Sequence, residues 1–325
     1  MTAAMTHGIA LIGLGIMGRR MIGRLNAHGG FRIAAMWDPS SEACAAAARE
    51  APGAAIAAGP EAAVARDDVA CVYIASPPAS HPALCHLAFD RGKAVFCEKP
   101  LTADVAAGAA LVARVVGESR PAAVNFSFAS SASFQAVVAA ATSGELGALR
   151  RIEIAASFAK WPRDWQDAGP WLRERAEGGF AREVLSHFVF ATQRLTGALA
   201  LRGSRVSYPP DGRTAETALT AAFDAQGVTV SIDAAIRGDV ADTNLWTVTG
   251  ERGAMRMRDW YALERLGPDG GWRPAMAGGV EDLRAAAGQR QLDQLAALLE
   301  GRAHTLASFD EALGVQRAVE AMLAA

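Results

Sequence analysis

Short apolar runs alternate with alanine-rich stretches over the first 120 residues, and glycine, proline or serine ends each run. The runs predict strands at residues 8–12, 31–37, 71–75 and 94–97. The alanine-rich stretches predict helices at residues 16–28, 41–50, 81–91 and 103–118. Strands that are apolar on both faces and separated by helices form a parallel sheet covered on each side. We therefore expect an amino-terminal doubly wound parallel sheet, a Rossmann-type α/β domain.

The pattern changes beyond residue 122, where polar and apolar side chains begin to alternate with a period of two. This alternation is typical of strands with one face toward a core, and it occurs at residues 151–159, 199–208, 217–223, 228–236 and 245–249. Other elements are expected as a strand at 123–128 and helices at 134–142, 281–299 and 310–323. We predict a carboxy-terminal α+β domain with a large, mostly antiparallel open sheet. The predicted domains are 1–122 and 123–325, and the closing helices are candidates to pack back on the first.

Composition narrows the class of protein. The chain has 325 residues and 51% hydrophobic positions, which suits about two globular domains. Its 32 basic and 34 acidic side chains give a net charge of −2, which argues against general nucleic-acid or polybasic membrane binding. No stretch has the pattern of a bilayer-spanning helix. The four cysteines lack a CxxC spacing and follow no secretory leader, so we expect reduced core residues in a cytoplasmic protein.

A GxGxxG motif follows the first predicted strand and opens the first predicted helix. Backbone N–H groups and the helix dipole can hold a pyrophosphate at such a place. Asp38 stands twenty residues beyond Gly18, at the end of the next strand, where a carboxylate accepts both ribose hydroxyls of NAD and repels the 2′-phosphate of NADP. We predict NAD, with NADP as the open alternative, at Gly13, Gly15, Ile16, Met17, Gly18 and Asp38.

Lysine is rare in this chain, and Lys99 is one of only three among the 32 basic residues. It follows the strand at 94–97 and therefore lies at the carboxyl edge of the parallel sheet, where ligands bind in such folds. An ammonium group can share a proton, whereas a guanidinium stays charged. Lys99 is thus a candidate for acid–base chemistry, and a surface lysine before a loop proline is the alternative.

Several segments together resemble the Gfo/Idh/MocA oxidoreductase family. They are the glycine loop, Ala75-Ser76-Pro77-Pro78 with His81, Cys97-Glu98-Lys99-Pro100, Gly144-Glu145-Leu146-Gly147, Gly178-Gly179 with His187, and the run from Val248 to Ala254. The resemblance spans nearly the whole chain. It implies an NAD(P)-binding domain in which five further residues help to hold the cofactor: Ser76, Pro77, His81, Glu98 and Lys99. It also implies a second domain whose open sheet forms a homodimer or homotetramer.

The same resemblance implies a catalytic set of Lys99, Glu183 and His187. Glu183 and His187 are four residues apart in a predicted helix, so both can face one pocket. A carboxylate beside an imidazole orients the ring and favours its charged form. Glu183 stands where the family usually has aspartate, and this longer side chain puts the geometry of proton transfer in question. A histidine packed inside a helix interface is the alternative for His187.

The segment before that helix is rich in aromatic and charged side chains. Flat rings with charged neighbours can stack on a sugar and bind its hydroxyls, or they can pack the loop onto the sheet. The candidate substrate residues are Trp161, Arg163, Trp165, Trp171 and Arg182. No metal site is predicted, because His81 and His86 are five apart with no HExxH or Cys/His cluster.

These features predict an NAD(P)-dependent oxidoreductase that transfers hydride between nicotinamide and a secondary alcohol or ketone. The expected substrate is a sugar, a polyol or a similar small hydroxylated molecule. Two alternatives stay open: a glycoside hydrolase that uses tightly held NAD in a transient oxidation, and a non-catalytic NAD-binding regulatory protein.

Overall fold

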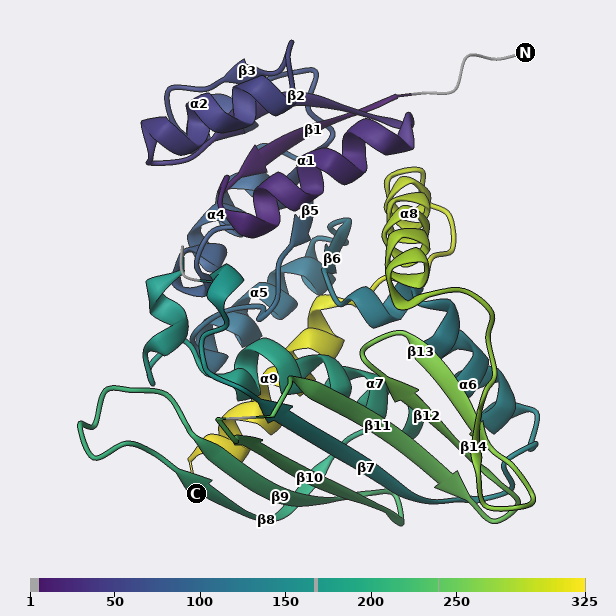
Figure 1. The fold of residues 1–325 in the computed structure, drawn as a ribbon. Helices are drawn as coiled ribbons and strands as arrows, with labels where there is room; N and C mark the ends of the chain where they lie inside the picture. Colours follow the sequence, from purple (N-terminus) through teal and green to yellow (C-terminus); the bar gives the residue numbers. More distant parts are fainter. Residues whose placement is uncertain (1–5, 167–168, 239, 325) are drawn as a thin grey trace. The chain divides into compact units, whose positions relative to one another are not determined.

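A computed structural model describes residues 6–166, 169–238 and 240–324. The chain forms two compact units (Figure 1). The amino-terminal unit runs to Phe126 and includes Gly288–Leu313, and the carboxy-terminal unit comprises Ser127–Ala287 and residues from Gly314 onward. Two helices cross from one unit to the other, α8 (Val280–Leu299) and α9 (Phe309–Leu323).

The amino-terminal unit contains a six-stranded parallel sheet of order β3-β2-β1-β4-β5-β6. This order is that of a dinucleotide-binding Rossmann sheet, which confirms the predicted fold of the unit. The strands are β1 (His7–Ile12), β2 (Phe31–Trp37), β3 (Ala55–Ile56), β4 (Cys71–Ile74), β5 (Ala94–Cys97) and β6 (Ala122–Val124). The helices are α1 (Ile16–His28), α2 (Ser41–Glu50), α3 (Pro60–Val64), α4 (His81–Asp90) and α5 (Val105–Gly117).

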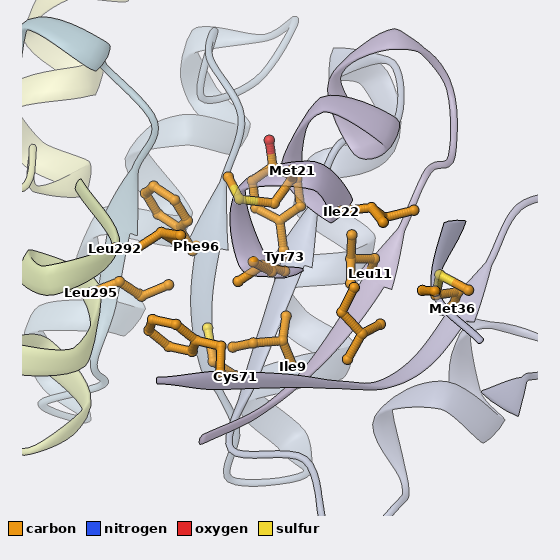
Figure 2. Packing of buried hydrophobic residues seen from close by; sticks show 14 of the residues in the cluster. Ile9, Leu11, Met21, Ile22, Met36, Cys71, Tyr73, Phe96, Leu292 and Leu295 are labelled. Atoms are coloured by element: carbon orange, nitrogen blue, oxygen red, sulfur yellow. The ribbon is translucent and has the colours of Figure 1, made fainter. Parts of the chain in front are cut away.

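The core of this unit joins residues far apart in the chain. Figure 2 shows side chains of β1, β4 and β5 packed beside Leu292 and Leu295 of α8. Leu292 is 1% exposed and Leu295 is 2% exposed. The end of the sequence therefore supplies part of the hydrophobic core of the first unit. All four cysteines are free and buried, as predicted: Cys44, Cys71, Cys85 and Cys97.

The carboxy-terminal unit contains an eight-stranded sheet of order β14-β13-β12-β11-β7-β10-β9-β8. Among the strands in the described part of the chain, only β7 and β10 pair in parallel within this sheet, so it is mostly antiparallel as predicted. Its strands are β7 (Leu149–Phe158), β8 (Ala200–Ser207), β9 (Ala218–Ala225), β10 (Val228–Ile236), β11 (Thr243–Gly250), β12 (Ala254–Arg258), β13 (Ala262–Leu266) and β14 (Trp272–Pro274).

Two helices cover one face of this sheet, α6 (Ala132–Thr142) and α7 (Ser186–Thr196). Trp246 of β11 is fully buried; its indole N–H donates to Thr192 Oγ1 of α7 at 2.9 Å, and its ring lies 5.9 Å from that of Phe134 in α6. The residues that alternate with the buried ones are exposed, for example Thr220 and Asp233. The sheet thus has one helix-covered face and one face of small and polar side chains.

The strand expected at 123–128 is wrong beyond Val124. β6 ends there, and Ser127–Ser130 form a short 3-10 helix. Asn125 turns its side chain toward a buried carboxylate instead of extending the strand. Of the helices in the described residues, none is long and apolar enough to cross a membrane.

Candidate active site

The glycine loop between β1 and α1 requires glycine at two of its three motif positions for steric reasons. Gly13 has φ of 93°, and a Cβ there would lie 2.5 Å from the backbone carbon of Ala75. A Cβ on Gly18 would lie 2.0 Å from the carbonyl oxygen of Gly13. The first glycine thus makes the turn, and the last lets α1 pack against the strand.

Gly15 is different, because its surroundings are open. It is exposed and its φ is an ordinary −70°. Among the described residues, no atom apart from those of Gly15 and its chain neighbours lies within 4 Å of a Cβ built there. It caps α1 without a side-chain hydrogen bond, and the first turn, which contains Ile16 and Met17, carries no acidic residue. The N–H groups of a first helical turn lack partners within the helix. The loop therefore has the space and the polarity that a pyrophosphate needs.

Asp38 follows β2 directly and contacts the glycine loop. Its Oδ2 accepts from the backbone N–H of Leu14 at 2.7 Å, and its Oδ1 accepts from that of Ser40 at 2.9 Å. These two bonds fix the carboxylate beside the loop while the side chain stays partly exposed. Ser40 caps α2, because its hydroxyl accepts from the Ala43 N–H.

His81 connects the loops that follow β4 and β5. Its Nε2 lies 2.9 Å from the carbonyl oxygen of Ser76, and its Nδ1 lies 3.0 Å from that of Pro100 and 3.2 Å from that of Leu101. The ring is fully buried. Burial lowers the pKa of His81, and the nearby charge of Lys99 lowers it further, against the carbonyl contacts that raise it. His81 therefore shapes the predicted cofactor loops from within the protein.

Ser76 and Pro77 begin the first of these loops. The hydroxyls of Ser76 and Ser80 lie 2.6 Å apart, and Ser80 Oγ also donates to the carbonyl oxygen of Pro77 at 2.7 Å. Pro77 is exposed and Ser76 is half-buried. The loop is thus held by its own hydroxyl groups at the carboxyl end of β4.

Glu98 and Lys99 follow β5 at the same edge of the sheet, and Lys99 is joined to Pro100 by a cis peptide bond. Glu98 is 5% exposed and accepts from Asn125 Nδ2 at 2.6 Å and from the Tyr73 hydroxyl. Burial, followed by the charge of Glu98, raises the pKa of Tyr73 well above its ordinary value. Sequence reasoning missed Tyr73 and Asn125, because they lie 25 and 27 residues from Glu98.

The helical segment that carries Glu183 and His187 begins with a π-helical turn, Ala181–Leu185, and continues as α7. Glu183 is half-buried within the π-helical turn, and His187 is 7% exposed in the first turn of α7. Turns of this kind occur often at functional sites. Both residues belong to the carboxy-terminal unit, and Lys99 belongs to the amino-terminal unit.

A buried carboxylate from outside the helix caps this π-helical turn. Glu216 Oε1 accepts from the Ala181 N–H at 2.7 Å, and Glu216 is 1% exposed. Gly179 has φ of 94°, and a Cβ there would lie 2.2 Å from Glu216 Oε2. Burial raises the pKa of Glu216. Glu216 and Gly179 thus set where the helix that carries His187 begins. No local sequence pattern points to Glu216, which lies 35 residues from Ala181.

The candidate substrate residues lie in different surroundings. Trp161 donates its indole N–H to the Leu172 carbonyl at 2.9 Å, and Arg163 pairs with Asp242 at 2.5 Å. Arg182 pairs with Glu320 at 2.7 and 2.8 Å, so it binds an acid of its own chain. Trp165 is 49% exposed and Trp171 is half-buried. Trp161 and Arg163 thus pack their loop, and the exposed ring belongs to Trp165.

No group of three or more His, Cys, Asp or Glu side chains in the described part of the chain could hold a metal ion.

Fold and glycine loop together define a class of protein, one with a dinucleotide-binding Rossmann domain and a second α+β domain. Residues 7–126 match the family model described as "Oxidoreductase family, NAD-binding Rossmann fold". The amino-terminal unit is therefore similar to this oxidoreductase family. The match agrees with the Gfo/Idh/MocA resemblance and with the predicted NAD cofactor.

Two relatives show how the similarity is distributed. An inositol 2-dehydrogenase of Mycolicibacterium gilvum is 34% identical over 114 residues, which are 35% of this chain and 33% of the relative. A dTDP-3,4-didehydro-2,6-dideoxy-alpha-D-glucose 3-reductase of Streptomyces violaceoruber is 29% identical over 285 residues, which are 85% of this chain and 80% of the relative. The match to the dehydrogenase thus spans about a third of that relative's length.

Solved structures share the whole fold. The WlbA dehydrogenase from Bordetella pertussis, in complex with NADH and UDP-GlcNAcA, has a TM-score of 0.82 at 20% sequence identity. The match covers 100% of this chain and 97% of that chain. This likeness confirms the two-domain fold.

Proposed function

We propose that the protein is an NAD-dependent dehydrogenase or reductase that interconverts a secondary alcohol and its ketone in a sugar, a polyol or a related hydroxylated molecule. The observation that carries this proposal is the glycine loop in the family-matched segment. Backbone atoms lie too close to Gly13 and Gly18 to leave room for a side chain, whereas the space beside Gly15 is open. The first turn of α1 that follows carries no acidic residue. The related dehydrogenase and reductase act on an inositol and a nucleotide sugar by their names, which supports this substrate class.

The residues of the amino-terminal unit would hold the cofactor. Backbone N–H groups at Gly15 and in the first turn of α1 would bind the pyrophosphate, and Asp38 would accept from the ribose hydroxyls. The loops at Ser76 and at Glu98, joined through His81, would line the remainder of the cofactor site. Nicotinamide, when bound, would accept or supply the hydride.

Three side chains would manage the proton. In the oxidation direction His187 takes the proton of the substrate hydroxyl, and Lys99 stabilises the developing alkoxide. Glu183 orients the imidazole of His187. His187→Ala should lower kcat by on the order of a hundredfold while NAD affinity stays within a few fold. Lys99→Ala should have a similar effect and a shifted pH–rate profile. A His187→Ala enzyme with full turnover would show that His187 has no such role.

An absorbance assay at the NADH band tests the reaction. Sugars, polyols and their keto forms are tested in both directions with both nicotinamides, and we expect turnover preferentially with NAD because Asp38 would repel a 2′-phosphate. Cofactor retained through dialysis with sugar release and no net NADH would support the glycosidase alternative instead. NADH binding without turnover on any compound would support a regulatory protein.

The exposed face of the eight-stranded sheet is the surface that we propose for self-association into a dimer or tetramer. Its side chains are small or polar, such as Thr220, Ala222, Thr229 and Asp233. Such a face permits close packing of a second sheet with little rearrangement. Light scattering coupled to size-exclusion chromatography measures the oligomeric state, and a monomer at micromolar concentration would contradict this surface.

A further inference from the structure

The imidazole of His187 lies against two aromatic rings from other parts of the carboxy-terminal unit. The ring centroids of His187 and Trp260 are 5.2 Å apart, and the rings are inclined by 81°. Phe128 lies 5.9 Å from His187 at 69°. Phe128 and Trp260 are themselves 5.7 Å apart. His187 is therefore in contact with both members of an aromatic pair.

Trp260 reaches this position from an unusual backbone conformation. It lies in the link between β12 and β13, where Asp259 has φ of 50° and Trp260 has φ of 73°. Residues with side chains seldom adopt positive φ, and for a bulky residue such a value is an outlier. Glycine would fit this backbone more easily than tryptophan. The indole is thus present despite an unfavourable conformation, and such conformations cluster at functional sites.

A buried side chain from the neighbouring strand holds the link. Asn244 of β11 is 6% exposed, and its Oδ1 accepts from the Trp260 N–H at 2.8 Å. The carbonyl oxygen of the same residue accepts from the Asp259 N–H at 3.1 Å. Two hydrogen bonds from one residue therefore fix the backbone at which the indole begins.

Trp260 differs in its surroundings from Trp246, the tryptophan in the core of the carboxy-terminal unit. Trp246 is fully buried between the sheet and its helices, whereas Trp260 keeps part of its surface exposed. The inner side of Trp260 packs on Phe188, 5.4 Å away, which follows His187 in α7. The indole is thus anchored on the same helix turn that carries the histidine.

We propose that Trp260 is a positioning residue for His187; the proposal rests on the proposed function of His187 as the proton acceptor. The torsion that turns an imidazole about its Cβ–Cγ bond is broad. Two neighbouring rings inclined steeply to the imidazole restrict that rotation. Proton transfer tolerates little misplacement of the base, so Trp260 sustains the rate through His187 without exchanging a proton itself.

Kinetics of matched variants test this role. Trp260→Leu removes the ring, and Trp260→Phe keeps an aromatic ring. The control is Trp272→Leu, which removes a tryptophan that packs under Arg256 in the β13–β14 hairpin and not against His187. The substrate is myo-inositol, or the sugar or polyol with the highest rate in the NADH assay. We expect Trp260→Leu to lower kcat at least tenfold with KM and NAD affinity within threefold, and Trp260→Phe and Trp272→Leu to stay within threefold of wild type.

Two kinetic results would overturn the proposal. One is an unchanged kcat in Trp260→Leu. The other is a raised KM at an unchanged kcat, which would make Trp260 a wall for the substrate instead. If Trp260→Leu fails to fold, Asn244→Ala is the alternative, because it removes the hydrogen bond to the Trp260 N–H and keeps the indole. A fall in the kcat of Asn244→Ala of at least fivefold supports the proposal, and a wild-type kcat refutes it.

A second readout needs no substrate, so it separates this proposal from the proposed function. The chain has 6 histidines, and His187→Asn assigns the imidazole carbon-bound protons of His187 in an NMR spectrum of the full-length protein. We expect one sharp set in wild type and Trp260→Phe, and broadened or doubled signals in Trp260→Leu. Equal line widths and numbers of signals in all three would refute the positioning role even if the enzyme is active. Changed signals in a protein that turns over no compound would uphold the positioning and reject the reaction.

Discussion

Gly15→Ala should separate cofactor binding from folding. The added methyl group meets no atom within 4 Å, and the backbone φ of −70° suits alanine. Removing a glycine from the unfolded chain stabilises a protein by about 0.4–1 kcal/mol when the native conformation is compatible. We therefore expect an unchanged or slightly raised melting temperature.

The same methyl group would occupy the place at which the pyrophosphate meets the backbone. Loss of one hydrogen bond to a charged group costs about 1.5–3 kcal/mol, which corresponds to a roughly tenfold to hundredfold weaker Kd for NAD. Isothermal titration with NAD+ and with NADH measures this effect.

Two further variants act as controls. Gly23 lies on the exposed side of α1, also with no atom within 4 Å of a Cβ; Gly23→Ala should stabilise the helix by about 1 kcal/mol and leave NAD affinity unchanged. Gly13→Ala should lower the melting temperature, because its Cβ would lie 2.5 Å from backbone. Wild-type NAD affinity in Gly15→Ala would refute the proposed pyrophosphate site.

Two predictions concern buried ionisable groups. Tyr73→Phe should lower the free energy of unfolding by about 2 kcal/mol, because the buried Glu98 loses a donor. The folded-state pKa of Tyr73 is raised above the ordinary 10.0, so its contribution to stability is present below pH 10 and is lost as the pH rises beyond it. Urea unfolding should show this alkaline loss of stability in wild type and in the control Tyr261→Phe. If the free energy of unfolding of Tyr73→Phe falls with pH as steeply as that of wild type, Tyr73 is not its source. Burial raises the pKa of Glu216 above 4.5, so wild-type stability should fall as pH rises from 4.5 through the raised value. Glu216→Gln keeps a side-chain oxygen that accepts from the Ala181 N–H, and its stability should not fall over this pH range. A Glu216→Gln protein less stable than wild type near pH 7 would contradict the raised pKa of Glu216.

The sequence predicted the parallel sheet well, because apolar runs and glycine breaks are local signals. α1, β2, α2 and β5 have the predicted bounds. The strands β12, β13 and β14 were missed because each has five residues or fewer, too few for a clear alternation of apolar and polar side chains. The strand predicted at 123–128 was extended too far because these residues continue an apolar run, but β6 ends at Val124, and the Asn125 side chain binds Glu98.

In the candidate site, too, residues close together in the chain could be predicted, and residues brought together by the fold could not. The glycine loop and Asp38 could be placed from spacing alone, because the motif and its neighbours are close in the chain. The residues that hold the helix of the candidate catalytic residues could not be predicted from the sequence. Glu216 lies 35 residues from Ala181, and Trp260 reaches His187 through a backbone conformation that nothing in the surrounding sequence indicates.

The first hydrophobic core depends on residues that the ribosome adds long after the strands they cover. Leu292, Leu295 and Leu306 belong to the cluster that also contains Ile9 and Leu11 of β1. During synthesis the nascent Rossmann sheet must therefore wait for more than 160 residues of the second unit before this apolar surface is covered. A fragment cut after Phe126 would keep the glycine loop but expose that surface to water, so we expect it to aggregate unless residues 288–313 are supplied as a separate peptide.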